Sequence, residues 1–89
     1  MIDTEKLGFQ FPCSFPLKAM GYNADDFEAL IVSIVRRHVP LFDDGAVTSR
    51  TSDGGKYLSV TATFIADSRE QLDGLYQELS DHTRVLMLL

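Results

Sequence analysis

The side chains that could do covalent or acid–base chemistry are few and scattered along this chain of 89 residues. A nucleophile needs a base within hydrogen-bonding reach, and a zinc site needs Cys, His or carboxylate ligands grouped together. The sequence has one cysteine, Cys13, and two histidines, His38 and His82. Cys13 lies in a proline-flanked stretch, and neither histidine has a second ligand at a suitable spacing. We therefore expect no catalytic residue, no metal site and no cofactor.

Carboxylates and hydroxyls give no stronger signal. The adjacent aspartates Asp25-Asp26 and Asp43-Asp44 have neighbouring side chains that point apart, and each pair has a structural role, at a helix start and in a turn. The hydroxyls between Ser59 and Thr63 alternate along an expected strand with no base beside them. We predict that the protein is not an enzyme.

One stretch has a better geometry for binding a ligand, and it comprises Met20, Gly21, Tyr22 and Asn23. Here a strand is expected to end, Gly21 bends the chain, and the amides of a helix N-terminus open outward, where they can bind an anionic group. The simpler interpretation is a strand-to-helix connection in which Asn23 caps the helix. Both interpretations remain open from the sequence.

Composition limits the class of partner and the compartment. The net charge of −5 and the pI near 4.7 argue against a general binder of nucleic acid or anionic membranes. A single cysteine is typical of a reducing compartment. The sequence has no apolar run of membrane-spanning length and no signal-peptide pattern at its start. These features predict a cytoplasmic protein with no membrane contact.

The elements that would position these residues are organised around one strand. Tyr57 to Ala66 alternates strictly between an apolar set and a largely hydroxyl-bearing set, which is the period of a strand with one buried face. The turn at Asp53-Gly54-Gly55 precedes it, so Ala46 to Ser52 should pair with it as a hairpin.

Four further elements complete the chain. A strand is expected over Ser14 to Met20, ended by Gly21, and a helix from Asn23 to about His38, stopped by Pro40. Ser68 and Gln71 form a capping box that opens a second helix. The last strand is expected over Arg84 to Leu89.

The resulting order, β-α-β-β-α-β, predicts an α+β, ferredoxin-like two-layer sandwich with two helices on one face of a four-stranded sheet, antiparallel or mixed. We expect the first and third strands to run parallel in the middle of the sheet. Residues 12–89 would form this single domain and residues 1–11 an N-terminal tail. Gly74, inside the second helix, is expected to allow a close contact with the sheet.

A two-layer domain leaves one sheet face bare. The expected interaction face comprises Lys18, Tyr57, Ser59, Thr61, Thr63, Leu86 and Leu88. The last strand is apolar on both sides, which suggests that its outer face is covered. A second subunit, the tail with Phe9 and Phe11, or another protein could supply the cover, and a homodimer is one expectation.

Several stretches together resemble a known family. They are FPLKAMG at Phe15 to Gly21, VRRHVP at Val35 to Pro40, SDGGKYLSVT at Ser52 to Thr61, EQLDGLYQEL at Glu70 to Leu79, and RVLMLL at Arg84 to Leu89. In order and spacing they are similar to the YbeD-like family of small bacterial proteins of unknown function, over nearly the whole chain from Phe11. The departures are an acid-rich N-terminus and a different loop at Leu41 to Val47.

The resemblance implies a ferredoxin-like fold similar to ACT regulatory domains, and no established activity. Genes of the family often lie beside lipoate-attachment genes. In ACT domains the glycine after the first strand lines an amino-acid site at a dimer interface, and Gly21 stands at the corresponding place.

The leading hypothesis is a small non-enzymatic regulatory or interaction module. It would bind a small metabolite at Gly21 to Asn23, or a protein on the bare sheet face. An accessory protein or enzyme subunit of lipoate metabolism is the second hypothesis. RNA binding through the sheet ranks last, because it needs two or three stacking aromatics on a basic face and only Tyr57 is expected in position.

Overall fold

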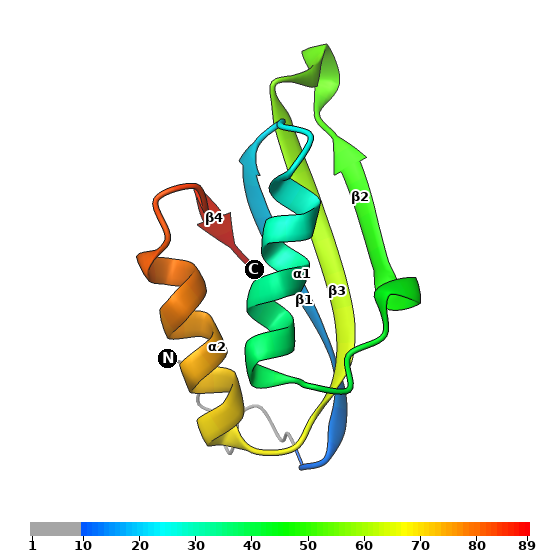
Figure 1. Cartoon of the computed structure of the whole chain (residues 1–89), viewed down its shortest axis with the longest axis vertical. Coiled ribbons are helices and arrows are strands. Elements are labelled where there is room, and N and C mark those ends of the chain that lie inside the picture. The colour runs from blue at the N-terminus through cyan, green and yellow to red at the C-terminus, as the bar shows by residue number, and fades with distance from the viewer. Residues whose placement is uncertain (1–9) are drawn as a thin grey trace.

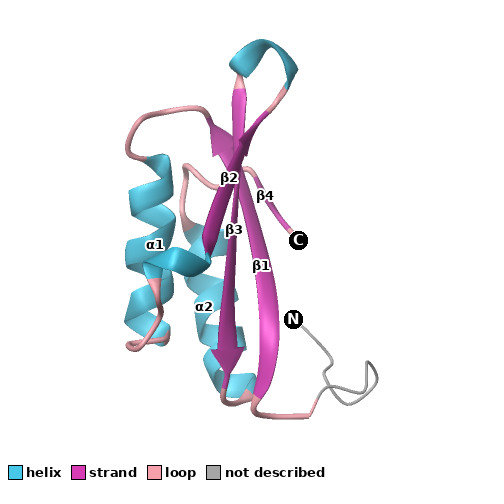
Figure 2. Cartoon of the chain, turned by 90° about the vertical axis from the view of Figure 1, so that its right-hand side faces the viewer, coloured by secondary structure: helices cyan, strands magenta, loops and turns pink. Residues whose placement is uncertain are grey.

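A computed structural model describes residues 10–89 of the chain, and it has two layers (Figures 1 and 2). The elements follow the predicted order: β1 (Cys13–Tyr22), α1 (Phe27–His38), β2 (Val47–Thr51), β3 (Tyr57–Ala66), α2 (Arg69–Asp81) and β4 (Met87–Leu88). Short 3-10 turns at Asp44–Ala46 and Asp53–Gly55 flank β2. Both helices lie on one side of the sheet, which confirms the predicted fold class.

The sheet has the strand order β2-β3-β1-β4, and every neighbouring pair is antiparallel. The prediction that β1 and β3 run parallel was wrong. The crossover through α1 makes β2 parallel to β1, and the hairpin then reverses the chain from β2 into β3. β3 therefore runs opposite to both β1 and β2, and it lies between them in the sheet.

The strand β3 has the bounds that its alternation predicted. Val60, Ala62, Phe64 and Ala66 are buried on the side that faces the helices. Gly54 and Gly55 have φ angles of 82° and 74°, which residues with a side chain rarely adopt, so the two glycines permit the tight connection to β2.

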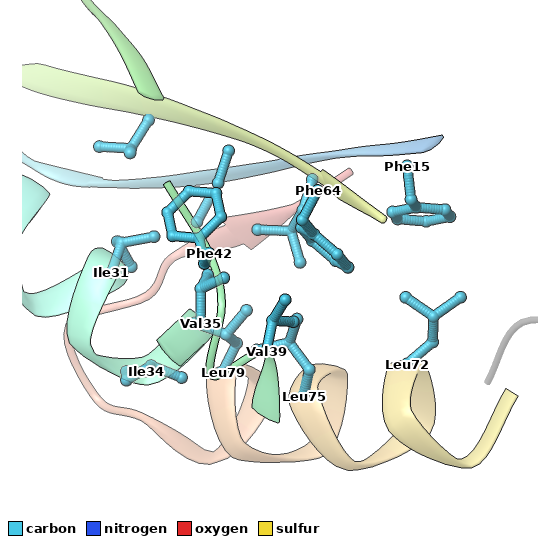
Figure 3. Close-up of a cluster of buried hydrophobic side chains, with 14 of the residues drawn as sticks. Phe15, Ile31, Ile34, Val35, Val39, Phe42, Phe64, Leu72, Leu75 and Leu79 are labelled. Carbon is cyan, nitrogen blue, oxygen red and sulfur yellow. The ribbon is translucent and has the colours of Figure 1, made fainter. Parts of the chain in front are cut away.

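The core lies between the sheet and the helices. Its helical side is a stripe of apolar residues on each helix, Phe27, Ile31, Ile34 and Val35 on α1 and Leu72, Leu75 and Leu79 on α2. Figure 3 shows Phe15 and Phe64 pointing from the strands toward Leu72 and Leu75. Their ring centroids are 5.9 Å apart, so the two aromatic residues pack against each other across β1 and β3.

The connection from β1 to α1 differs from the prediction. β1 continues through Gly21 to Tyr22, and α1 begins at Phe27 rather than directly after Asn23. The Asn23 side chain donates a hydrogen bond to the Gly55 carbonyl, and its backbone N–H donates to the Lys56 carbonyl. Asn23 therefore fastens the hairpin turn to the end of β1 and does not cap the helix.

The start of α2 agrees with one half of the predicted capping box, because the Ser68 hydroxyl accepts a hydrogen bond from the Gln71 N–H. The Gln71 side chain accepts from the N–H of Asp67, one residue before the N-cap, so the reciprocal bond is shifted by one residue. Gly74 makes its close approach to α1 and not to the sheet, because a Cβ there would lie 3.4 Å from the His38 ring.

The last strand is shorter than predicted and has a different phase. β4 spans Met87–Leu88, and backbone hydrogen bonds of Leu86 and Leu89 with β1 extend the contact. Leu88 pairs with Ala19 and packs against the core, so it does not belong to the bare face. Met87 pairs with Met20, so Met87 is the residue of β4 that lies on the bare face.

The predicted tail lies almost entirely outside the described residues, except that Phe11 packs against the core. Within the described part of the chain, neither helix is long and apolar enough to cross a membrane.

Candidate functional site

The candidate site is the face of the sheet that the helices leave uncovered, which we call the open face. Residues that alternate with the buried ones, and their partners across the strands, make it up. The open face comprises Ser14, Pro16, Lys18, Met20, Tyr22, Thr48, Arg50, Tyr57, Ser59, Thr61, Thr63, Ile65 and Met87.

The charges of the open face have one sign. The four strands contain two charged residues, Lys18 and Arg50, and no Asp or Glu. Both cations are exposed on the open face, where Lys18 pairs with Thr61 and Arg50 with Ser59. The described carboxylates lie on the helices and in the turns, so this acidic protein has a cationic sheet face.

Two aromatic rings lie at the end of the open face near the hairpin turn. Tyr22 and Tyr57 pair across β1 and β3 and stack with centroids 5.5 Å apart and planes 23° apart. The Lys56 ammonium lies 5.4 Å from the centre of the Tyr57 ring, which is cation–π geometry. Tyr22 is 57% exposed. This end of the face thus offers aromatic surface beside positive charge.

Apolar side chains occupy the edge near β4. Met87 is 51% exposed and lies across from the half-buried Met20. Leu86, which precedes the strand, is 47% exposed. Flexible methionines adapt to the shape of a partner, and Tyr, Met and Arg are enriched at protein interfaces.

The stretch from Met20 to Asn23 does not form a common cavity. Met20 and Tyr22 lie on the open face, whereas Gly21 is buried on the helix side. A Cβ at Gly21 would lie 2.5 Å from both the Arg84 carbonyl oxygen and the Phe27 ring, so close packing explains the glycine.

The start of α1 is occupied by an ion pair. The Arg84 guanidinium donates to both carboxylate oxygens of Asp26, at 2.7 and 2.9 Å. These hydrogen bonds lower the pKa of Asp26 and raise that of Arg84. Asp26 thus places a negative charge at the helix N-terminus, where it is favourable.

The residues considered for covalent chemistry each have a structural contact. The His38 Nε2 lies 2.8 Å from the Glu78 carboxylate, which also pairs with Arg37. His82 Nδ1 accepts a hydrogen bond from the Arg84 N–H, and Cys13 is half-buried against the core. Among residues 10–89 no group of three or more potential ligands could hold a metal ion.

The sequence reasoning missed Arg50 and Tyr22 as members of the face. Arg50 could have been assigned from the hairpin register, because a turn at Asp53–Gly55 places Arg50 opposite Ser59 on the same face. Tyr22 could have been assigned to the face by continuing the alternation of β1 past Met20. The structure does place Lys18, Tyr57, Ser59, Thr61 and Thr63 where the alternation put them.

Comparison with known proteins identifies the family. Residues 6–89 match the family described as protein of unknown function (DUF493). The chain belongs to this family. A UPF0250 protein of Nitrosomonas europaea is 48% identical over 86 residues, covering 97% of this chain and 99% of that protein. A UPF0250 protein of Chromobacterium violaceum is 43% identical over the full length of both.

These matches confirm the resemblance to small bacterial proteins of unknown function. Among solved structures, the solution structure of protein HP0495 from H. pylori has a TM-score of 0.74 and 16% identity, covering 98% of this chain and 91% of that one. At this identity the likeness concerns the fold. The DUF493 relatives carry no assigned activity, so a function must be argued from the surface of the molecule.

Proposed function

We propose that this DUF493 protein is a non-enzymatic interaction module whose open face docks an acidic surface of a partner protein. The observation that carries the proposal is the charge of the sheet. The strands hold Lys18 and Arg50 and no carboxylate, in a chain of net charge −5. A cationic face on an acidic protein favours one orientation of approach, because an acidic partner is attracted to that face and repelled by the rest.

The non-ionic part of the open face supports the same proposal. Tyr22 and Met87 provide exposed apolar surface on either side of Met20, and the hydroxyls of Ser59 and Thr61 lie beside this surface on β3. An apolar contact area with polar groups around it is the usual make-up of a transient protein interface. A regulatory role would follow if docking controls the partner's activity.

Site-specific photo-crosslinking in cells tests this proposal. A photoreactive amino acid at Thr61, in the middle of the open face, should yield a protein adduct, and the same amino acid at Glu70 on α2 should not. Lys18→Glu combined with Arg50→Glu should abolish the Thr61 adduct. Arg36→Glu combined with Arg69→Glu changes the net charge equally on the helices and should leave it intact. An adduct that survives the strand reversal would contradict the proposal.

Single-stranded RNA is the second candidate, and one observation favours it. Tyr22 stands beside Tyr57 on the two central strands, so the face has two aromatics rather than the one expected. It ranks lower because the rings stack on each other and the sheet has two cations, whereas a nucleic-acid site tracks several phosphates. A Thr61 adduct that ribonuclease reduces to nearly the mass of the free chain would select this candidate.

An accessory role in lipoate metabolism is the pathway that the family resemblance suggests. Its support is indirect, since it comes from the neighbourhood of related genes. The same experiment bears on it, because mass spectrometry of the Thr61 adduct would identify the partner. If that partner is a protein of lipoate metabolism, the open face would be the surface through which the chain acts in this pathway.

A further inference from the structure

A second surface feature lies at the end of β3 that leads into α2, where it borders the open face at Thr63 and Ile65. It is a groove of about 540 Å³ between the loop that follows α1 and the last residues of β3. Val39 to Asp43 form one side and Thr63 to Ile65 the other. Phe42 and Phe64 meet edge to face, with centroids 6.5 Å apart, so the wall of the groove is packed.

One side of the groove is an unpaired strand edge. Pairing between β2 and β3 ends at Val47 and Ala62, and β3 continues to Ala66 beyond the end of β2 (Figure 1). The Tyr57 carbonyl accepts from the Ser52 N–H on the β2 side. Because peptide groups of alternate residues in a strand point the same way, those of Ile65 point to the side that β2 has left.

The groove also has exposed apolar groups and a single sign of charge. Leu41 is 96% exposed and Ile65 is 56% exposed. The lining residues include Asp43 and Asp67 and no Lys, Arg or His. An apolar patch beside an open strand edge and two carboxylates matches an extended chain with apolar and cationic side chains.

We propose that this groove binds an extended segment of a partner protein, which pairs with β3 beyond Ala62. An apolar side chain of that segment packs against Leu41 and Ile65, and a Lys or Arg lies near Asp43 and Asp67. The charge of the groove is opposite to that of the open face, so the two surfaces select different partners. This proposal therefore stands whether or not the open face docks an acidic protein.

The charge argument also decides between the possible occupants. Residues 1–9 of this chain contain Asp3 and Glu5 and one lysine, so they match the acidic groove poorly. In a second copy, Lys18 lies on the central strand β1, which has no free edge. Arg50 lies on the edge strand β2, whose exposed residues are all polar, so β2 offers no exposed apolar side chain for the groove. A separate cationic segment fits the groove better than either of them.

A random twelve-residue peptide library displayed on phage, selected against the full chain, tests the proposal. The enriched peptides should share apolar residues that alternate with Lys or Arg. Calorimetric titration of a synthetic enriched peptide should show affinity losses of roughly tenfold or more for Leu41→Lys and for Asp67→Lys. Leu86→Lys and Asp53→Lys, which make the same changes far from the groove, should leave the affinity unchanged. Absence of enrichment, enrichment of acidic peptides, or equal losses in the control variants would overturn it.

The pairing itself has a separate readout. In the complex, hydrogen exchange of the Ile65 amide should slow. A peptide N-methylated at the residues that face β3 should bind at least tenfold more weakly, because it cannot form the strand hydrogen bonds. Full affinity of the methylated peptide would overturn strand pairing. A chain without residues 1–9 that binds the peptide much more tightly would identify the tail as the occupant and overturn the assignment to a partner.

Discussion

At the scale of single residues, Gly21 has a packing role that its sequence context did not reveal. Its Cα lies against the Phe27 ring and the Arg84 carbonyl, so it joins β1, α1 and the approach to β4. A side chain has no room there unless one of these three elements moves. The residue is therefore important for the fold, whether or not a ligand approaches its neighbours.

We predict that Gly21→Ala lowers the free energy of unfolding by about 1–3 kcal/mol, the usual cost of overpacking a core. Gly74→Ala is the matched control, because its Cβ would lie at ordinary contact distance, 3.4 Å, from the His38 ring. Removing a glycine from a helix interior should stabilise the fold by up to about 1 kcal/mol. Urea unfolding of both variants checks the pair, and a neutral Gly21→Ala would show that the site can relax.

The sequence predicts the open face in part: it succeeds where a strand alternates between polar and apolar residues and fails where it does not. The alternation of β3 fixed the orientation of Tyr57, Ser59 and Thr61 without tertiary information. Leu88 was misplaced because the sequence VLMLL at Val85 to Leu89 is apolar at every position, so it has no alternation that shows which side chains face the core. Its orientation comes from pairing with Ala19, which only the assembled sheet provides.

At the scale of elements, caps and turns were predicted well where they depend on neighbouring residues. Ser68 and Gln71 set the start of α2, and Gly54 and Gly55 the hairpin. The start of α1 was wrong because the distant carbonyl of Gly55 takes the side chain of Asn23. A contact over this sequence separation leaves no local pattern.

The helix pair is joined by a polar contact that should depend on pH. Glu78 on α2 pairs with Arg37 and hydrogen-bonds to His38, both on α1. The hydrogen bonds from Arg37 and then His38 lower the pKa of Glu78. A carboxyl group with a lowered pKa in the folded state stabilises the fold above the pKa of the unfolded chain, and this contribution is lost as the pH falls through the folded pKa.

We therefore predict that Glu78→Gln destabilises the fold at about pH 7 by no more than about 1 kcal/mol, because the pair is partly exposed. The difference from the unmodified chain should shrink below about pH 4 and vanish at lower pH, where both side chains are neutral. Denaturant unfolding at several pH values measures it, with Asp53→Asn in the exposed hairpin turn as the control. A difference that grows on acidification would contradict the assigned role.

At the scale of the whole molecule, the carboxylates of the described residues are kept away from the open face. The helices and turns hold the described carboxylates, and the open face holds Lys18 and Arg50. A twofold dimer that buries the open face would place the same patch on both sides of the interface. Neither copy would then have a strand carboxylate to neutralise the other's cations, so the charge pattern disfavours self-association through this face.

We accordingly predict a monomer at all concentrations in size-exclusion chromatography with light scattering, for the unmodified chain and for Met87→Lys. Met87 is the test position because it is exposed at the apolar edge of the open face. The unmodified chain could instead form a dimer that Met87→Lys splits and Leu41→Lys leaves intact. This result would assign the open face to self-association and contradict the proposal that it docks an acidic partner. A dimer that only Leu41→Lys splits would instead place a second copy at the groove beside β3, because Leu41 lines that groove and lies in no strand of the open face.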